Sequence, residues 1–143
     1  MRELVPFHLA FPVYDLDETR RFYGELLGCA EGRSSAQWID FNLFGHQIVA
    51  HLTAPTTQRA QCSDVDGHDV PVRHFGLVLP HIEWERLAKR LSAAEVEFLI
   101  APGLRFEGQI GAQWTLFIQD PAGNALEFKS MVNPDELFAR PTP

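Results

Sequence analysis

The hydrophobic pattern at the start of the chain predicts a strand followed by a helix. Residues 6–13 alternate between large apolar side chains and small or polar ones, which is typical of a half-buried strand. Apolar residues then recur near helical spacing, after an aspartate cap at Asp15 or Asp17 and before Gly28, which ends the helix. Three shorter strands are expected next, over about residues 30–35, 37–44 and 47–53, the last two joined by a hairpin turn.

The same order of elements returns in the second half of the chain. Between residues 54 and 70 the pattern dissolves into polar residues, Pro and Gly, which indicates a linker or a loop beside a site. The elements expected after it are a strand at 72–80, a helix at 84–94, a strand near 96–100, a Gly-rich loop to 111, and paired strands at 114–119 and 125–131. A short helical tail is expected last, docked by Leu137 and Phe138.

Matched residues suggest that the two halves are copies of one module. The run His8-Leu9-Ala10-Phe11 resembles His74-Phe75-Gly76-Leu77, at an offset of 66. Later in each half, Trp38 precedes His51 by 13 residues and Trp114 precedes Glu127 by 13. We therefore expect one domain over residues 1–143, with a first module at about 5–53, a loop at 54–70, a second module at about 71–131 and a tail at 132–143.

Strand alternation places several chemically active side chains on the faces away from the helices. His8 shares its face with the small Ala10, and His74 shares its face with Gly76, which leaves space beside each imidazole. Glu127 lies between two packed apolar residues, where an unpaired charge is costly to bury. Paired modules would bring four side chains onto one concave surface: His8, His51, His74 and Glu127.

Imidazole and carboxylate ligands together suit Fe(II), Mn, Ni or Zn, and two histidines with one carboxylate form the facial arrangement of non-haem iron oxygenases. The alternative is structural, because a single strand histidine is more often a satisfied, half-buried residue. Glu127 would in that case be a carboxylate at the rim, paired to Lys129 or to an arginine.

Composition and charge narrow the class of protein. The chain has 143 residues with 45% apolar and 11% aromatic residues, which is a globular composition. Its net charge is −7 and its basic residues are scattered, so we expect no nucleic-acid partner. Two cysteines make no disulfide framework, and no run of 18 apolar residues occurs, so we expect a cytoplasmic protein without a leader or membrane segment.

Several motifs resemble the vicinal oxygen chelate superfamily, over about residues 5–131. That superfamily holds glyoxalase I, extradiol dioxygenases, and fosfomycin- and bleomycin-resistance proteins. The opening resembles it at residues 6–13 and 21–28, and the most specific match is the ending Phe117-Ile118-Gln119-Asp120-Pro121-Ala122-Gly123-Asn124-Ala125-Leu126-Glu127-Phe128. Residues 38–41, 44–47, 74–76 and 105–106 are similar to short bacterial proteins described as predicted extradiol-type dioxygenases.

The resemblance implies an α+β fold of two βαβββ modules in tandem, forming a curved mixed sheet around a divalent metal. Fe(II) is favoured, with Mn, Ni or Zn as alternatives, and the implied ligands are His8, His74 and Glu127. His51 falls near the position of a fourth ligand in glyoxalases and of an acid–base histidine in ring-cleaving dioxygenases, so both roles stay open. Ala112 departs from the family, which has an acidic residue before Gln113.

The function implied most directly is an extradiol-type dioxygenase that cleaves the ring of a small catechol-like substrate, as a homodimer. His51 or His46 would transfer a proton, a role that suits an imidazole pKa near ~6.5. Candidate substrate contacts are Trp38, Arg105, Phe106, Gln113 and Trp114, although the two tryptophans would equally suit the core of the sheets. The alternatives are a glyoxalase-like lyase or isomerase with four ligands to Ni or Zn, and a drug- or metabolite-binding resistance protein without catalysis.

Overall fold

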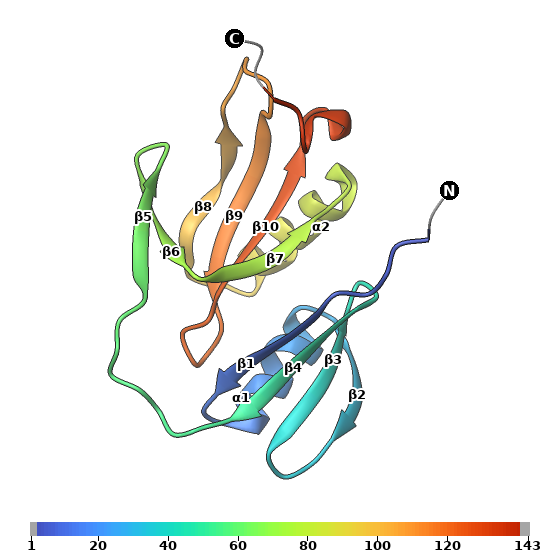
Figure 1. Cartoon of the computed structure of the whole chain (residues 1–143), viewed down its shortest axis with the longest axis vertical. Helices are drawn as coiled ribbons and strands as arrows, with labels where there is room; N and C mark the ends of the chain where they lie inside the picture. The colour runs from blue at the N-terminus through green and yellow to red at the C-terminus, as the bar shows by residue number, and fades with distance from the viewer. Residues whose placement is uncertain (1–2, 141–143) are drawn as a thin grey trace. The chain divides into compact units, whose positions relative to one another are not determined.

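In the computed structural model, which describes residues 3–140, the chain folds into two compact units. Unit 1 contains residues up to Thr57 together with the turn Asp120–Asn124. Unit 2 contains Gln58–Gln119 and the chain from Ala125 onward. Each unit is built on a four-stranded sheet (Figure 1).

Unit 1 follows the predicted order of a strand, a helix and three strands. Its elements are β1 (His8–Val13), α1 (Leu16–Thr19), which continues as a π-helical segment (Arg20–Leu26), β2 (Ala30–Ser34), β3 (Trp38–Leu43) and β4 (His46–Leu52). The sheet order is β1-β4-β3-β2, with β1 parallel to β4 and the other pairs antiparallel. Phe11 and Val13 are buried, as the alternation in β1 predicts.

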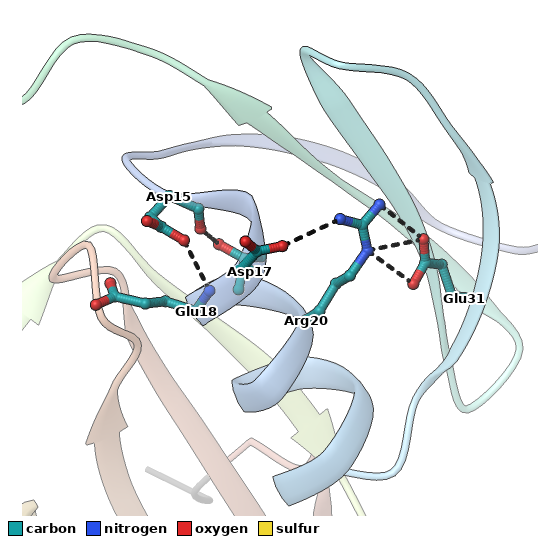
Figure 2. Close-up of polar contacts among 6 residues, drawn as sticks. Asp15, Asp17, Glu18, Arg20 and Glu31 are labelled. Carbon is teal, nitrogen blue, oxygen red and sulfur yellow. Dashed lines mark hydrogen bonds and ion pairs between the residues drawn. The ribbon is translucent and has the colours of Figure 1, made fainter.

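The start of α1 is fixed by acidic residues, which Figure 2 shows. Asp15 is the cap, because its carboxylate accepts a hydrogen bond from the backbone N–H of Glu18 at 2.9 Å. One turn later Arg20 lies 3.8 Å from Asp17 and 3.1 Å from Glu31 on β2. The guanidinium therefore links the helix to the edge strand of its own unit.

The core of unit 1 is centred on Tyr23, which has no exposed surface. Its ring packs against Phe11 and Phe41, with ring centroids 5.3 and 5.4 Å away. Its hydroxyl donates a hydrogen bond of 2.7 Å to Asp120 Oδ2. The same carboxylate accepts hydrogen bonds from Asn124, through its backbone N–H and its side-chain amide, at 2.8 Å each. The aspartate of the family-like ending therefore has a structural role.

Stability of the protein is expected to fall in alkaline solution. Burial raises the pKa of Tyr23 well above its ordinary value, and the charge and hydrogen bond of Asp120 raise it further. Burial also raises the pKa of the Cys29 thiol to about 11. Both groups lose their protons at lower pH when the chain is unfolded. Their contribution is therefore complete below about pH 8, under the pKa of an unfolded cysteine, and is lost as the pH rises further.

Urea unfolding between pH 7 and pH 11 measures this effect. We expect these two groups to leave the free energy of unfolding constant up to about pH 8 and to cause a decline above it. Tyr23→Phe lowers the value by about 1–3 kcal/mol at neutral pH, because Asp120 loses a buried donor, and it makes the alkaline decline shallower. An unchanged alkaline slope in Tyr23→Phe would contradict the assignment of this effect to Tyr23.

Unit 2 repeats the same order and adds a hairpin in front of it. Its elements are β5 (Gln61–Val65), β6 (His68–Val72), β7 (His74–Val78), α2 (His81–Ala93), β8 (Phe98–Arg105), β9 (Gln113–Gln119), β10 (Ala125–Met131) and a 3₁₀ turn (Pro134–Glu136). The main sheet has the order β7-β10-β9-β8, with β7 parallel to β10. Trp84 of α2 fixes the helix to the sheet by donating its indole N–H to the carbonyl of Phe128 at 2.9 Å.

The predicted α+β fold of two βαβββ modules is confirmed, but two local predictions were wrong. Residues 54–70 are not all irregular, because β5 and β6 pair as an antiparallel hairpin. Asp66 and Gly67, with φ of 51° and 77°, supply the two left-handed residues that a tight hairpin turn requires. At the tail, Phe138 is 91% exposed and does not dock against unit 2.

Candidate functional site

The face of the unit 2 sheet that lies away from α2 carries a cluster of polar side chains. In the strand register Glu127 lies opposite Gly76 on β7 and opposite Phe117 on β9. Lys129 lies opposite Thr115 on β9, one pleat further along the same face. His74 is two residues before Gly76 on β7, so alternation also puts its imidazole on this face.

Gly76 has a packing role in this sheet that the sequence did not reveal. A Cβ atom at position 76 would overlap the backbone carbonyl of Glu127. The sequence-based expectation was that Gly76 leaves space for a ligand. The structure corrects this, since the space is filled by the backbone of β10. The glycine therefore allows β7 and β10 to approach closely beside His74.

His74 and Glu127 face each other with defined nitrogen and oxygen atoms. His74 Nδ1 lies 2.6 Å from the carbonyl oxygen of Pro71, which can only accept, so Nδ1 carries a proton. His74 Nε2 points to Glu127 and lies 3.4 Å from its Oε1. The other oxygen of Glu127 accepts a hydrogen bond from the Thr115 hydroxyl. Both side chains are thus oriented by a second partner.

Electrostatics couple the two groups and add a lysine. The hydrogen bond to Glu127 raises the pKa of His74, against the opposite effect of burial. Burial raises the pKa of Glu127, but hydrogen bonds from His74 and Thr115 and the charge of Lys129 outweigh it, so this pKa is lowered. Lys129 Nζ lies 3.7 Å from Glu127 Oε1. Without a metal ion, Glu127 is therefore held in its ionised form by hydrogen bonds from its neighbours and by the charge of Lys129.

The same pair fits two ligands of a divalent metal. Ligand atoms about 2.1 Å from one metal lie about 3.0–3.4 Å apart at octahedral or tetrahedral angles, which matches the distance from His74 Nε2 to Glu127 Oε1. An imidazole whose Nδ1–H is held by a backbone carbonyl is the usual form of a histidine ligand. Across residues 3–140, however, no group of three or more His, Cys, Asp or Glu side chains is close enough together to hold a metal ion. Unit 2 therefore brings together two side chains whose spacing fits metal ligands.

A cavity of about 220 Å³ opens beside this pair within unit 2. Its lining joins the sheet face to the β5–β6 hairpin and consists of Val65, His68, Val70, His74, Ile100, Arg105, Phe106, Gln113, Thr115, Phe117, Glu127 and Lys129. Val70, Ile100 and Phe117 form a buried apolar cluster in it. Three predicted substrate contacts, Arg105, Phe106 and Gln113, thus lie around the same cavity as two predicted metal ligands. The sequence missed Thr115, Lys129 and the hairpin residues as part of it.

Trp114, another predicted substrate contact, lies elsewhere. Its ring packs against Trp84 and His81 of α2, with centroids 5.8 and 5.7 Å away. It follows Gln113 and precedes Thr115, both of which line the cavity, so alternation turns it to the helix side of the sheet. Trp114 therefore does not line the cavity as predicted; it lies half-buried between the sheet and α2, which is nearer to the alternative of a packing role.

In unit 1, His8 is oriented by a chain of polar side chains. His8 Nδ1 lies 2.7 Å from Gln47 Oε1, and the Gln47 amide nitrogen donates to Asp40 Oδ2 at 3.4 Å. Arg33 lies 3.5 Å from the same carboxylate oxygen. With Nδ1–H donated to Gln47, the Nε2 atom of His8 is the one that presents a lone pair. The register of β1 against β4 gives Gln47 this position, directly opposite His8.

Strand register also corrects the matching of the two halves. In unit 2, His74 lies opposite Ala125 and Glu127 is two residues further along β10. In unit 1, His8 lies opposite Gln47, so the equivalent of Glu127 is Val49. His51 is the equivalent of Lys129, and the equal spacing of the Trp–His and Trp–Glu pairs was misleading. Unit 1 has an apolar side chain where a fourth carboxylate-type ligand would lie.

The other sequence-predicted residues of unit 1 are placed as follows. His51 is exposed and lies opposite Trp38 in the register of β3 and β4. Trp38 is half-buried, and the Arg33 guanidinium lies 5.7 Å from its ring centroid. His46 Nδ1 accepts a hydrogen bond from the backbone N–H of Phe7 at 2.8 Å, so only its Nε2 is left for other partners.

Comparison with known proteins identifies the family. The model of the Glyoxalase/Bleomycin resistance protein/Dioxygenase superfamily matches residues 6–128. The chain belongs to this superfamily. A structure described as glyoxalase/bleomycin resistance protein/dioxygenase from Alicyclobacillus acidocaldarius is 33% identical, with a TM-score of 0.80 over 96% of this chain and 100% of that one. The resemblance found in the sequence is thereby confirmed.

More distant structures of the superfamily share the fold. The fosfomycin resistance protein FosX of Listeria monocytogenes is 18% identical, with a TM-score of 0.68 over 95% of this chain and 98% of that chain. The lactoylglutathione lyase of Agrobacterium tumefaciens is also 18% identical, with a TM-score of 0.62 over 91% and 96%. No match is found among curated proteins.

Superfamily members bind divalent metal ions and include lyases and dioxygenases, which agrees with the His74–Glu127 pair. In the part of the chain that the structure describes, no helix has the length and apolar character needed to cross a membrane.

Proposed function

We propose that the protein is a metal-dependent enzyme that binds its substrate through two adjacent oxygens, and that it is an extradiol-type dioxygenase acting on a small catechol-like molecule. The observation that carries this proposal is the pairing of His74 Nε2 with Glu127 Oε1 at 3.4 Å, each held by its own second partner. We propose Fe(II) as the metal, since imidazole and carboxylate ligands with open positions suit it.

His8 is proposed as the third protein ligand. This rests on its position in β1, which matches that of His74 in β7, and on the hydrogen bond that leaves its Nε2 free. Two histidines and one carboxylate would then leave positions open for a chelating substrate. We propose a homodimer, and the proposed ligand set is the same whether His8 comes from the same chain or from the second one.

The roles proposed for the protein groups follow from their surroundings. A divalent ion at this position would act as a Lewis acid that stabilises negative charge on the two substrate oxygens. Thr115 and the Pro71 carbonyl hold Glu127 and His74 in place, and the apolar cluster under the cavity excludes water. His51, exposed on the same sheet face as His8, is proposed as the group that accepts and returns a proton.

One observation favours three protein ligands over the four of a glyoxalase-like lyase or isomerase. Val49 occupies the position of unit 1 that matches Glu127, and it is buried and apolar. A four-ligand site for Ni or Zn would need His51 as the fourth ligand, but His51 lies two residues beyond Val49 along β4.

Oxygen uptake tests the proposed function. Protein purified without oxygen and loaded with Fe(II), Mn, Ni or Zn is assayed against a panel of catechols. We expect oxygen uptake with Fe(II), with both atoms of O₂ incorporated into a yellow ring-opened product. Isomerisation of a thiohemiacetal by the Ni or Zn form, without oxygen uptake in the Fe(II) form, would contradict the proposal and support the lyase alternative. Binding of substrates without any turnover would support the resistance-protein alternative.

A further inference from the structure

Beyond the metal ligands, the cavity of unit 2 carries an excess of positive charge. Among its lining residues Arg105 and Lys129 are cationic, whereas Glu127 is the single carboxylate. Glu127 is already engaged by His74, Thr115 and Lys129, and a metal ion would add further positive charge. A ligand that enters this cavity therefore meets one cation, Arg105, that has no carboxylate partner among the described residues, and a second, Lys129, that shares Glu127 with His74.

Arg105 is the more informative of the two. Within residues 3–140, its guanidinium has no hydrogen-bonding or ion-pair partner, although the residue is half-buried at the end of β8. It lies opposite Gln113 in the register of β8 and β9, on the cavity face. A half-buried arginine without a protein partner, aligned with a cavity, is suited to hold a planar anion through two parallel hydrogen bonds.

Apart from the polar residues His68 and Gln113, the remainder of the lining is apolar, and the volume of the cavity limits the size of the ligand. Phe106 and Phe117 offer aromatic surface, and Val70 and Ile100 complete the apolar side. A volume of about 220 Å³ is below the ~300–1,000 Å³ that is typical of sites for drug-sized ligands. These features fit a single ring better than a fused or extended molecule.

We propose that the cavity selects a small aromatic carboxylate, with Arg105 and Lys129 binding the carboxylate and the apolar cluster contacting the ring. The assignment of two vicinal hydroxyls to this substrate rests on the proposed function, whereas the anion subsite is argued from the cavity alone. The structural alternative is that Lys129 only neutralises Glu127 and that Arg105 is a solvated residue.

Binding to the metal-free full-length protein tests the subsite. Two probes that share a vicinal diol are compared by calorimetry and by amide chemical shifts, namely catechol and 3,4-dihydroxybenzoate. We expect the carboxylate to bind at least about tenfold more tightly to the wild type. In Arg105→Gln and in Lys129→Met, the ratio of the affinities for 3,4-dihydroxybenzoate and catechol falls towards one. The ratio is unchanged in the control Arg86→Gln, because Arg86 belongs to α2, on the other side of the sheet. Equal binding of the two probes, or an unchanged preference in Arg105→Gln, would overturn the proposal.

The same two probes separate this inference from the proposed function. If no catechol supports oxygen uptake but the carboxylate preference depends on Arg105, the subsite stands and the dioxygenase proposal fails. If the Fe(II) protein consumes oxygen equally well with catechol and 3,4-dihydroxybenzoate, the dioxygenase stands and the subsite fails. Folding of each variant is checked by its amide spectrum, and Arg105→Lys, which keeps the charge but loses the planar fork, is expected to show an intermediate preference.

Discussion

Glu127→Gln is expected to weaken the binding of divalent metal by at least about 100-fold, because it removes the charged ligand of the proposed site. Loss of an outer partner of a ligand typically weakens metal affinity by ~10–100-fold, and loss of the ligand itself has the larger effect. The amide keeps the volume of the side chain and can still accept the hydrogen bond from Thr115. Calorimetric titration of the metal-free protein with Mn²⁺ or Co²⁺ measures the affinity directly.

Two further variants make this result specific. Thr115→Val removes the hydroxyl that orients Glu127 and is expected to weaken metal binding by about 10–100-fold. Glu97→Gln changes an exposed carboxylate outside the cavity lining and should leave the affinity unchanged. Metal content in Glu127→Gln equal to that of the wild type would show that Glu127 is not a ligand, and both the dioxygenase and the lyase proposals would then fail.

Gly76→Ala is expected to be the most damaging single-methyl change in unit 2. The added Cβ would overlap the Glu127 carbonyl, a backbone atom that cannot rotate away. Relief requires β7 to separate from β10, which breaks ladder hydrogen bonds and moves His74 away from Glu127. Overpacking usually lowers the free energy of unfolding by about 1–3 kcal/mol, and we expect a loss at or above the upper end of that range.

Gly103→Ala is the matched control in the same sheet. A Cβ there would lie 3.7 Å from a guanidinium nitrogen of Arg105 and 3.8 Å from the carbonyl oxygen of Ala101, which are ordinary contact distances. Urea unfolding is expected to show a small change for Gly103→Ala and a large one for Gly76→Ala. Equal stability of the two variants would show that the close approach of β7 and β10 is not required.

The sequence correctly predicted those strands and helices in which the apolar residues of the pattern are also the buried residues of the fold. Alternation located β1 and the face of His8, and the apolar pattern located the helix α2, in which Leu87 and Leu91 are buried. The β5–β6 hairpin was missed because all residues of β5 are exposed and only Val70 of β6 is buried, so polar composition hid an extended backbone. Such a hairpin is fixed by its turn and its pairing, which composition does not report.

The candidate site was predicted in part for a related reason. The residue types and the alternation of side chains along each strand were enough to place His74 and Glu127 on one face. The alternation does not show which residues of two neighbouring strands lie opposite each other; the strand register does. Equal spacing matched His51 to Glu127, whereas pairing matches Val49 to it. Likewise, Trp114 lies between Gln113 and Thr115 in β9, so its side chain points to the other face of the sheet, away from the cavity that these two residues line. The roles of His8, His51 and His46 stay predictions.

The hydrogen bond from Tyr23 to Asp120 also has a consequence for biosynthesis. Its partners are 97 residues apart in the chain, so the core of the first unit contains a group that is synthesised long after its other parts. At ~5–20 residues per second, the nascent chain waits about 5–20 s for the turn that accepts the tyrosine hydroxyl. The first unit is thus complete only when the turn Asp120–Asn124 has been made, and we expect a fragment ending at residue 57 to fold poorly by itself.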